Sequence, residues 1–291
     1  MRELYHYDHI NADTKIFGVI ADPVRHSLSP LLHNTAFRQL GMNCMYIPFR
    51  VPQEYLGQFL KEAPGLGVHG LSVTIPHKEG VLPHLFRTDK AVQGIGAANT
   101  IVFQDEGLVG YNTDYRAAME SLEEDMKLEG EKTLMLRGKV AVVLGAGGAA
   151  RAIGFGLIRR GAKVFLASRT KSRAVDLAHR LGCEAIDWSS RHKIQPQILV
   201  NCTPVGLHPD VDETPFNPAY LMPSMTVFDT VYNPENTLLI KQAREKHCKT
   251  ITGVEMFVRQ AALQFKIFTG QSAPQEALRE TLKRATSAAR H

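Results

Sequence analysis

The chain has 291 residues, of which 44% are hydrophobic, enough for one large or two medium-sized domains. Its net charge of +5 is spread along the chain, which fits anionic small molecules and argues against a nucleic-acid groove. The four cysteines lie far apart without metal-ligand spacing, so we expect a reduced, cytoplasmic protein without a metal site. The first residues lack an apolar signal core, and no apolar run approaches the ~20 residues of a membrane span.

The first third of the chain predicts a strand at 15–20, a helix at 30–40 and a strand at 46–51. The loop between the first two ends with Ser29 at the expected N-cap and Pro30 at the first helical position. Capping explains one serine. Ser27 and Ser29 together, beside a helix N-terminus, could equally hold a carboxylate, and this stretch alone leaves both interpretations open.

Lys78 stands at an unusual place. A predicted strand at 68–73 runs into Pro76, which stops it, and Lys78 opens a predicted helix at 78–85. The helix dipole favours anions at this end, so the lysine is either solvated and indifferent or retained for chemistry.

The stretch 94–103 predicts a glycine turn into a strand, with Asn99 at the turn and Thr100 entering the strand. A further strand at 108–114 ends in Asp114. A long helix is predicted at 115–128. An N-cap role is physically sufficient for Asp114, and a functional role requires a partner.

The stretch 139–150 predicts a strand, a tight glycine turn and a helix. An apolar, β-branched run at 139–144 is typical of a parallel strand covered on both faces. Gly145, Gly147 and Gly148 allow a sharp turn and close approach of a ligand to the backbone, although Ala150 replaces the third glycine of the full motif. A helix at 149–161 and a strand at 163–166 complete a unit that predicts a Rossmann-type, doubly wound α/β fold.

The residues after the second strand indicate which dinucleotide is bound. NAD-specific folds place Asp or Glu about 20 residues beyond the first glycine. Here Arg169 stands 24 residues on, with Lys171 and Arg173 nearby and hydroxyls at Ser168 and Thr170. This charge suits a 2'-phosphate, so we expect NADP(H).

The last third predicts short strands at 198–200, 226–229 and 249–252 and a proline-rich surface loop at 206–223. Helices are expected at 237–247, 255–268 and 273–291. In the second of these, Gln260 and Gln264 share one face, and for Gln264 we favour a satisfied structural position.

An ordered set of motifs resembles the shikimate dehydrogenase family from about residue 15 to 270. The motifs are His26-Ser-Leu-Ser-Pro30 with His33-Asn34, Ser72-Val-Thr-Ile-Pro-His-Lys78, Gly96-Ala-Ala-Asn-Thr100, Asn112-Thr-Asp114, Gly145-Ala-Gly-Gly-Ala149, Ser168-Arg-Thr170, Asn201-Cys-Thr-Pro-Val-Gly206, Asp229-Thr-Val-Tyr-Asn-Pro234 and Gly253-Val-Glu-Met-Phe-Val-Arg-Gln-Ala-Ala262.

The resemblance implies NADPH-dependent reduction of 3-dehydroshikimate to shikimate in aromatic amino-acid biosynthesis. It implies a substrate domain at 1–114, an NADP domain at 115–252 and C-terminal helices at 253–291 that return to the first domain. It also implies a monomer or homodimer whose partners are small molecules.

The resemblance assigns site residues position by position. Lys78 and Asp114 would form the catalytic pair. Substrate would be bound by Ser27, Ser29, Thr74, Asn99, Asp114, Tyr232 and Gln260. The cofactor would be bound by Gly145, Ala146, Gly147, Gly148, Ala149, Ser168, Arg169, Thr170, Arg173, Thr203, Val231 and Gly253.

The chemistry suits these residue types. Hydride arriving at a carbonyl carbon leaves negative charge on oxygen, which a lysine ammonium can stabilise or protonate. Asp114 would keep that lysine charged while burial opposes it, so whether Lys78 transfers the proton or only stabilises the oxyanion stays open.

Several positions depart from the family pattern without removing a reacting group: Ser72, Ala117, Ser168 and Leu207. Two alternatives remain. A quinate/shikimate dehydrogenase would use the same Lys-Asp pair, although Ser29 favours shikimate and Arg169 favours NADP. A noncatalytic NADP-binding regulator is the more distant alternative, because Lys78 and Asp114 are both present.

Overall fold

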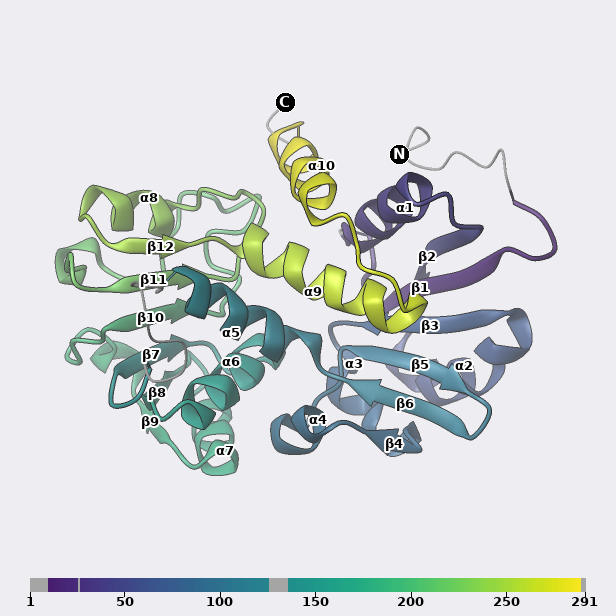
Figure 1. Ribbon diagram of the computed structural model, residues 1–291. Helices are drawn as coiled ribbons and strands as arrows, with labels where there is room; N and C mark the ends of the chain where they lie inside the picture. Colours follow the sequence, from purple (N-terminus) through teal and green to yellow (C-terminus); the bar gives the residue numbers. More distant parts are fainter. Residues whose placement is uncertain (1–9, 26, 126–135, 289–291) are drawn as a thin grey trace. The chain divides into compact units, whose positions relative to one another are not determined.

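The computed structural model describes residues 10–25, 27–125 and 136–288. His26 and the expected helical positions 126–128 and 289–291 lie outside these residues. The chain divides into two compact units, one of residues 1–113 with 260–284 and one of residues 114–259 with 285–291. Each unit contains a six-stranded sheet (Figure 1). The domain boundaries given above remain a prediction.

The first unit has a mixed sheet with the strand order β2-β1-β3-β5-β6-β4. Strands β1, β2 and β3 are parallel, whereas β5 runs antiparallel to both β3 and β6. The elements of this unit are β1 (Lys15–Ala21), α1 (Ser29–Gln39), β2 (Cys44–Arg50), α2 (Leu56–Glu62), β3 (Val68–Val73), α3 (His77–Gly80), β4 (Arg87–Thr88), α4 (Lys90–Ile95), β5 (Thr100–Gln104) and β6 (Gly107–Tyr111).

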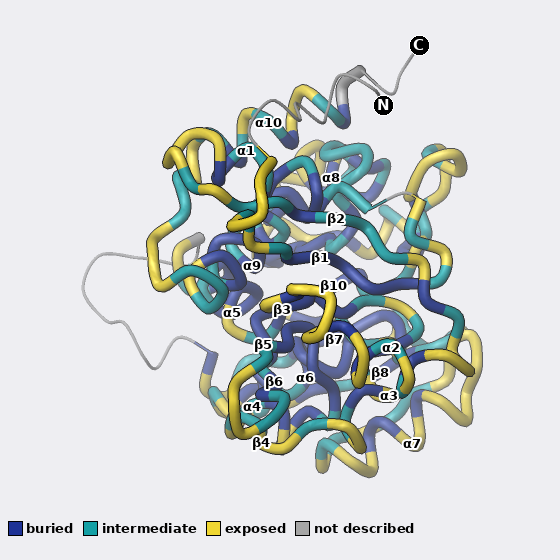
Figure 2. Tube along the Cα trace, turned by 90° about the vertical axis from the view of Figure 1, so that its right-hand side faces the viewer, coloured by how far each residue is buried: buried dark blue, intermediate teal, exposed yellow. Residues whose placement is uncertain are grey.

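The core of this unit forms because apolar side chains of the sheet meet those of the covering helices. Ile20, Leu71 and Ile101 are fully buried and pack with Leu60 of α2. Figure 2 shows β1 as buried along most of its length. The carboxyl ends of β1 and β3 therefore hold the loops that follow them in fixed positions.

The second unit has a wholly parallel sheet with the strand order β12-β11-β10-β7-β8-β9. The chain begins in the middle and winds outward in both directions, which is the doubly wound arrangement. Its elements are β7 (Val140–Leu144), α6 (Gly148–Arg159), β8 (Lys163–Ala167), α7 (Lys171–Leu181), β9 (Glu184–Ile186), β10 (Ile198–Asn201), β11 (Thr226–Asp229), α8 (Leu238–Glu245) and β12 (Lys249–Ile251).

Three helices have residues in the second unit and in the first. They are α5 (Thr113–Asp125), α9 (Gly253–Thr269) and α10 (Gln275–Ala288). None of the helices within the described ranges is long and apolar enough to cross a membrane.

The predicted α/β class and doubly wound sheet are confirmed, but the structure differs from the predictions in local details. The predicted helix at 78–85 is only the four-residue α3, followed by a 3-10 turn that contains Pro83. Helix α5 begins at Thr113, so Asp114 lies inside its first turn and is not the N-cap. Helix α7 and strand β9 were not predicted, although Ala174, Leu177 and Ala178 form a buried apolar face of α7 at helical spacing.

Candidate active site

Ser29 is not the N-cap of α1, contrary to the sequence-based expectation. Leu28 occupies that position and makes no side-chain cap, and α1 begins at Ser29 with Pro30 in its first turn. Ser27 Oγ accepts a hydrogen bond from the Ser29 backbone N–H at 3.3 Å. Ser27 therefore supplies the local turn, and the Ser29 hydroxyl is not used for capping.

Behind Ser29 lies a buried polar network. The Tyr46 hydroxyl donates to Ser72 Oγ at 2.5 Å and also hydrogen-bonds with Ser29. Ser72 Oγ in turn donates to Gln264 Oε1 at 2.9 Å. Gln264 Nε2 donates to the Asn99 carbonyl oxygen and to Thr100 Oγ1, each at 3.0 Å. The network links three predicted substrate segments: α1, the start of β5 and the helix that carries Gln260.

His33 packs against this network. Its ring stacks on Tyr46 with ring centroids 4.3 Å apart and an interplanar angle of 3°. Only 1% of the residue is exposed, and burial lowers its pKa from 6.5 to about 3, although a hydrogen bond with Gln264 opposes this shift. His33 is consequently neutral at physiological pH and serves as a flat support for Tyr46.

Asn99 fixes the start of α5. Its Oδ1 accepts the Thr113 backbone N–H at 2.8 Å, and its Nδ2 donates to Thr113 Oγ1 at 2.8 Å. A side-chain amide that makes both bonds has one orientation, with its nitrogen and oxygen assigned. Asp114, which follows Thr113 directly, is 6% exposed.

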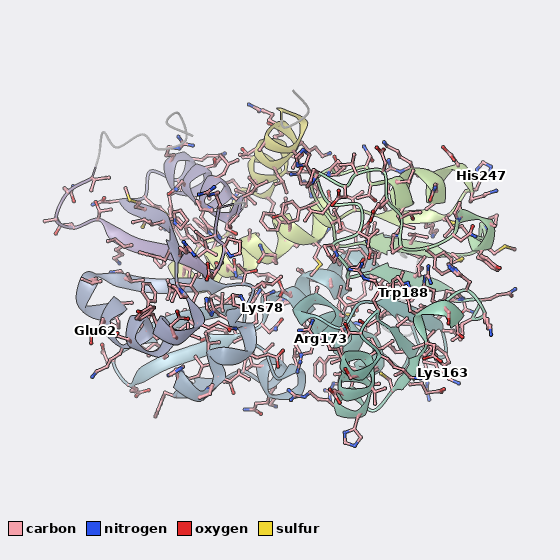
Figure 3. All side chains as sticks on the ribbon, turned by 180° about the vertical axis from the view of Figure 1, so that it is seen from behind. Glu62, Lys78, Lys163, Arg173, Trp188 and His247 are labelled. Carbon is pink, nitrogen blue, oxygen red and sulfur yellow. The ribbon has the colours of Figure 1, made fainter. Side chains whose placement is uncertain are left out.

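The backbone at Lys78 and the residue before it, His77, are anchored by hydrogen bonds. The Lys78 carbonyl oxygen accepts the Ala98 N–H at 2.8 Å. His77 is buried, and its Nε2 hydrogen-bonds the Val51 carbonyl oxygen at 2.6 Å. The Thr74 carbonyl oxygen accepts a hydrogen bond from the His77 backbone N–H at 2.8 Å. The lysine therefore extends from a short helix that three hydrogen bonds hold in place, and Figure 3 labels its side chain.

Two further predicted substrate residues lie in separate units. Gln260 is buried on α9 in the first unit, one turn before Gln264. Tyr232 belongs to the second unit, where its ring stacks on Phe257 at 4.4 Å, and burial raises the pKa of its hydroxyl.

The glycine turn of the second unit fits a pyrophosphate. Gly145 has φ +111°, and a Cβ there would lie 2.8 Å from the Cys202 carbonyl oxygen, so only glycine is accommodated. Gly147 is exposed, with nothing within 4 Å of the position of a Cβ, and it precedes α6 without a side-chain cap. The turn thus leaves open space beside the N–H groups at the start of a helix, which favours an anion.

Residues 168–173 follow β8 and are called the selector here, because they are predicted to distinguish NADP from NAD; they also fit a 2'-phosphate. Arg169 and Arg173 are exposed, and Figure 3 labels the Arg173 side chain on α7. Ser168 Oγ accepts the Thr170 N–H at 3.3 Å. Lys171 instead pairs with Asp187 at 2.8 Å. The two arginines are therefore the cations best suited to a phosphate at this position.

The three remaining predicted cofactor residues belong to two loops and a helix start. Thr203 follows β10, and its N–H and Oγ1 both donate to Asn201 Oδ1, at 3.0 and 2.7 Å. Val231 follows β11, and its N–H donates to Asp229 Oδ1 at 3.0 Å. Gly253 begins α9, where a Cβ would lie 2.4 Å from the Val231 carbonyl oxygen.

Sequence reasoning missed the residues that support these groups. Tyr46 and Asp229 were treated as parts of strands or motifs, although a tyrosine or a carboxylate within an apolar strand is a signal of a buried polar contact. Among the described residues, no group of three or more His, Cys, Asp or Glu side chains could hold a metal ion.

The parallel sheet, the glycine turn and the arginine-lined selector define a dinucleotide-binding α/β protein. Residues 19–101 match the shikimate dehydrogenase substrate binding domain, and residues 253–283 match the shikimate 5'-dehydrogenase C-terminal domain. The shikimate dehydrogenase (NADP(+)) of Methanosarcina acetivorans is 41% identical over 285 residues, which cover 94% of this chain and 99% of that protein. The chain belongs to the shikimate dehydrogenase family.

Solved structures agree with this assignment. A shikimate dehydrogenase in complex with NADP+ has a TM-score of 0.87 and 36% identity, covering 95% of this chain and 97% of that one. The Thermus thermophilus enzyme in complex with NADP(H) and shikimate has a TM-score of 0.82 and 35% identity, covering 93% and 99%. The chain spans 47% of the bifunctional 3-dehydroquinate dehydratase/shikimate dehydrogenase of Arabidopsis thaliana, to which it is 40% identical.

Proposed function

We propose that this protein catalyses the reversible, NADPH-dependent reduction of 3-dehydroshikimate to shikimate. The observation that carries the proposal is the anchoring of Lys78 and of the first turn of α5 to the adjacent residues Ala98 and Asn99. Because Asp114 follows Thr113 directly, both groups of the proposed catalytic pair extend from backbone that one short segment holds. The names of the similar proteins support the choice of substrate and cofactor.

In this proposal NADPH, when bound, supplies the hydride to the carbonyl carbon of the substrate. The Lys78 ammonium stabilises the negative charge that develops on the carbonyl oxygen or donates a proton to it, and Asp114 orients the lysine. The Ser27 and Ser29 hydroxyls bind the carboxylate of the substrate. Its ring hydroxyls are bound by Thr74, Asn99, Asp114, Tyr232 and Gln260.

The second unit holds NADP(H). The glycine turn at 145–149 binds the pyrophosphate through backbone N–H groups. Arg169 and Arg173, with the hydroxyls of Ser168 and Thr170, bind the 2'-phosphate. Thr203, Val231 and Gly253 line the nicotinamide end.

The deciding experiment measures reduced-nicotinamide absorbance with shikimate or quinate, each offered with NADP+ and with NAD+. We expect rapid reduction of NADP+ in the mixture with shikimate and no reduction in the other three mixtures. Preference for quinate or NAD+ would support a quinate/shikimate dehydrogenase, and no reduction in all four mixtures would support a noncatalytic NADP-binding regulator. The Lys78→Ala variant, purified identically, controls for a contaminating dehydrogenase from the expression host.

We further propose a cytoplasmic monomer or homodimer that acts on small molecules without nucleic-acid partners. Light scattering after size exclusion measures the mass in solution, and a mass above that of a dimer would contradict this assignment.

A further inference from the structure

Asp229 is a buried carboxylate at the end of β11 with three hydrogen-bond donors around it. It is 0% exposed. Its Oδ1 accepts from the Val231 N–H and from Asn201 Nδ2, each at 3.0 Å, and its Oδ2 accepts from the Thr237 hydroxyl at 2.7 Å. These three donors are neutral, and burial raises the pKa of Asp229 to about 6.

A buried carboxylate in this position lowers the free energy of unfolding, so stability does not explain its presence. Burying a charge disfavours folding even when hydrogen bonds offset part of the cost, and an apolar side chain would fill the same space without that cost. The arrangement is better explained by what the three donors hold.

The first of the held segments is the loop after β10. Asn201 Nδ2 donates to Asp229 and, at 3.3 Å, to the Val205 carbonyl oxygen, while Asn201 Oδ1 accepts both donors of Thr203. The bond to Asp229 therefore sets which way the Asn201 amide points, and that orientation sets the position of Thr203.

The second held segment is the loop after β11. The Val231 N–H is bound to Asp229, and the Val231 carbonyl oxygen lies where a side chain on Gly253 would collide with it. Thr237, which donates to Asp229, also caps α8 by accepting the Ile240 N–H at 3.3 Å. The loop is thereby fixed at both ends.

Strands β10 and β11 are neighbours in the sheet, and ligands of doubly wound sheets bind at the carboxyl ends of the strands. We propose that Asn201, Asp229 and Thr237 form a positioning triad that holds the loops of Thr203 and Val231 in the geometry that binds the nicotinamide end of the dinucleotide. This inference rests on the proposed cofactor, and the triad itself is not placed in contact with it.

The test compares Asp229→Asn and Thr237→Val with wild type, with Thr237→Ser as the conservative variant and Asp105→Asn, at an exposed turn of the first unit, as the matched control. The dissociation constant for NADP+ is measured by calorimetry, and melting temperature reports folding. We expect Asp229→Asn and Thr237→Val to weaken NADP+ by about tenfold, which corresponds to about 1.4 kcal/mol and is typical of one lost hydrogen bond to a charged group. Thr237→Ser and Asp105→Asn are expected to bind as wild type does.

Two further measurements, one kinetic and one of binding, separate positioning from a general loss of structure. The KM for shikimate is expected to stay within twofold of wild type. The ratio of NADP+ to NAD+ affinity is expected to be unchanged, because Arg169 and Arg173 follow β8, which β7 separates from β10 and β11 in the sheet. The inference is overturned if folded Asp229→Asn binds NADP+ as wild type does. It is also overturned if the KM for shikimate and the KM for NADP+ rise together with a lowered melting temperature. The same holds if Thr237→Ser binds NADP+ as weakly as Thr237→Val does.

Failure of the proposed function has a different outcome. A wild-type chain that binds NADP+ but oxidises neither shikimate nor quinate contradicts the proposed activity, while the calorimetric comparison still decides the role of the triad. A wild-type chain that binds neither dinucleotide overturns both.

Discussion

Gln264 and Asn99 are 165 positions apart in the sequence, yet Gln264 Nε2 donates a hydrogen bond to the Asn99 carbonyl oxygen at 3.0 Å. This bond ties the helix of Gln260 to the residue whose side chain anchors Thr113. Gln260 and Asn99, which are both predicted to bind substrate, are thus positioned by Gln264, which is not predicted to contact it.

Replacing Gln264 should therefore weaken substrate binding selectively. Gln264→Glu retains the oxygen that accepts from Ser72 but loses the donor to Asn99, and we expect the KM for shikimate to rise about tenfold with an unchanged KM for NADP+. Steady-state kinetics measures both constants. Gln271→Leu, at an exposed position beyond α9, is the control. Equal increases in the two KM values would argue against selective positioning.

Lys78→Ala should remove most turnover and leave cofactor binding intact. Loss of the only proposed acid or cation at the carbonyl oxygen is expected to lower kcat by about 10²- to 10⁴-fold. Single-turnover rates and NADP+ calorimetry on the same sample separate the two effects, with Lys61→Ala on α2 as an exposed control. Loss of NADP+ affinity with chemistry preserved would contradict the assigned role.

Arg169→Ala should discriminate between the two dinucleotides. A guanidinium that pairs with the 2'-phosphate contributes to NADPH binding and little to NADH binding, so we expect about a tenfold or greater loss for NADPH alone. Fluorescence titration with each dinucleotide measures this difference. Arg180→Ala, near the other end of α7, is the control. Equal losses for both dinucleotides would mean that Arg169 does not bind the phosphate.

Gly145→Ala should destabilise the second unit more than Gly182→Ala does. Gly145 and Gly182 both have positive φ, +111° and +70°, but only at Gly145 would a Cβ meet backbone, the Cys202 carbonyl oxygen at 2.8 Å. Gly182→Ala is expected to cost about 1 kcal/mol from backbone strain alone. Denaturant unfolding should give a clearly larger loss for Gly145→Ala, and equal losses would contradict the steric argument.

His33 should make the protein less stable in acid. Its pKa is about 3 when folded against an ordinary value of 6.5, so the unfolded chain takes up the proton first as the pH falls. Stability from this group is complete above pH 6.5 and is lost between 6.5 and 3, at about 1.4 kcal/mol per pH unit.

The matched experiment compares free energies of unfolding between pH 7 and 4 for wild type and His33→Gln. We expect a shallower loss in the variant, while His179→Gln, at an exposed position, keeps the wild-type slope. Asp229, whose raised pKa acts in the opposite direction, is common to all three proteins and cancels in the comparison. Identical slopes in wild type and His33→Gln would refute the prediction.

Features whose signals are local were predictable from the sequence. The glycine turn, the strands on either side of it and the arginine at the selector position depend on residues within one βαβ unit. The contact between Ser72 and Gln264 joins positions 192 apart, and no local pattern encodes it. The capping prediction for Ser29 failed for a local reason, because Ser27 Oγ already satisfies the Ser29 N–H and lets the helix begin one residue earlier.

The first unit depends on residues that are made near the end of the chain. The sheet of the second unit is one continuous stretch from Val140 to Ile251, whereas the first unit draws on residues 260–284 as well as 1–113. The bonds of Gln264 to Ser72 and Asn99 can form only after the whole nucleotide-binding sheet has been synthesised. All strands of the first sheet lie between residues 15 and 111, so the segment made first acquires its contacts with α9 only after most of the chain has been made.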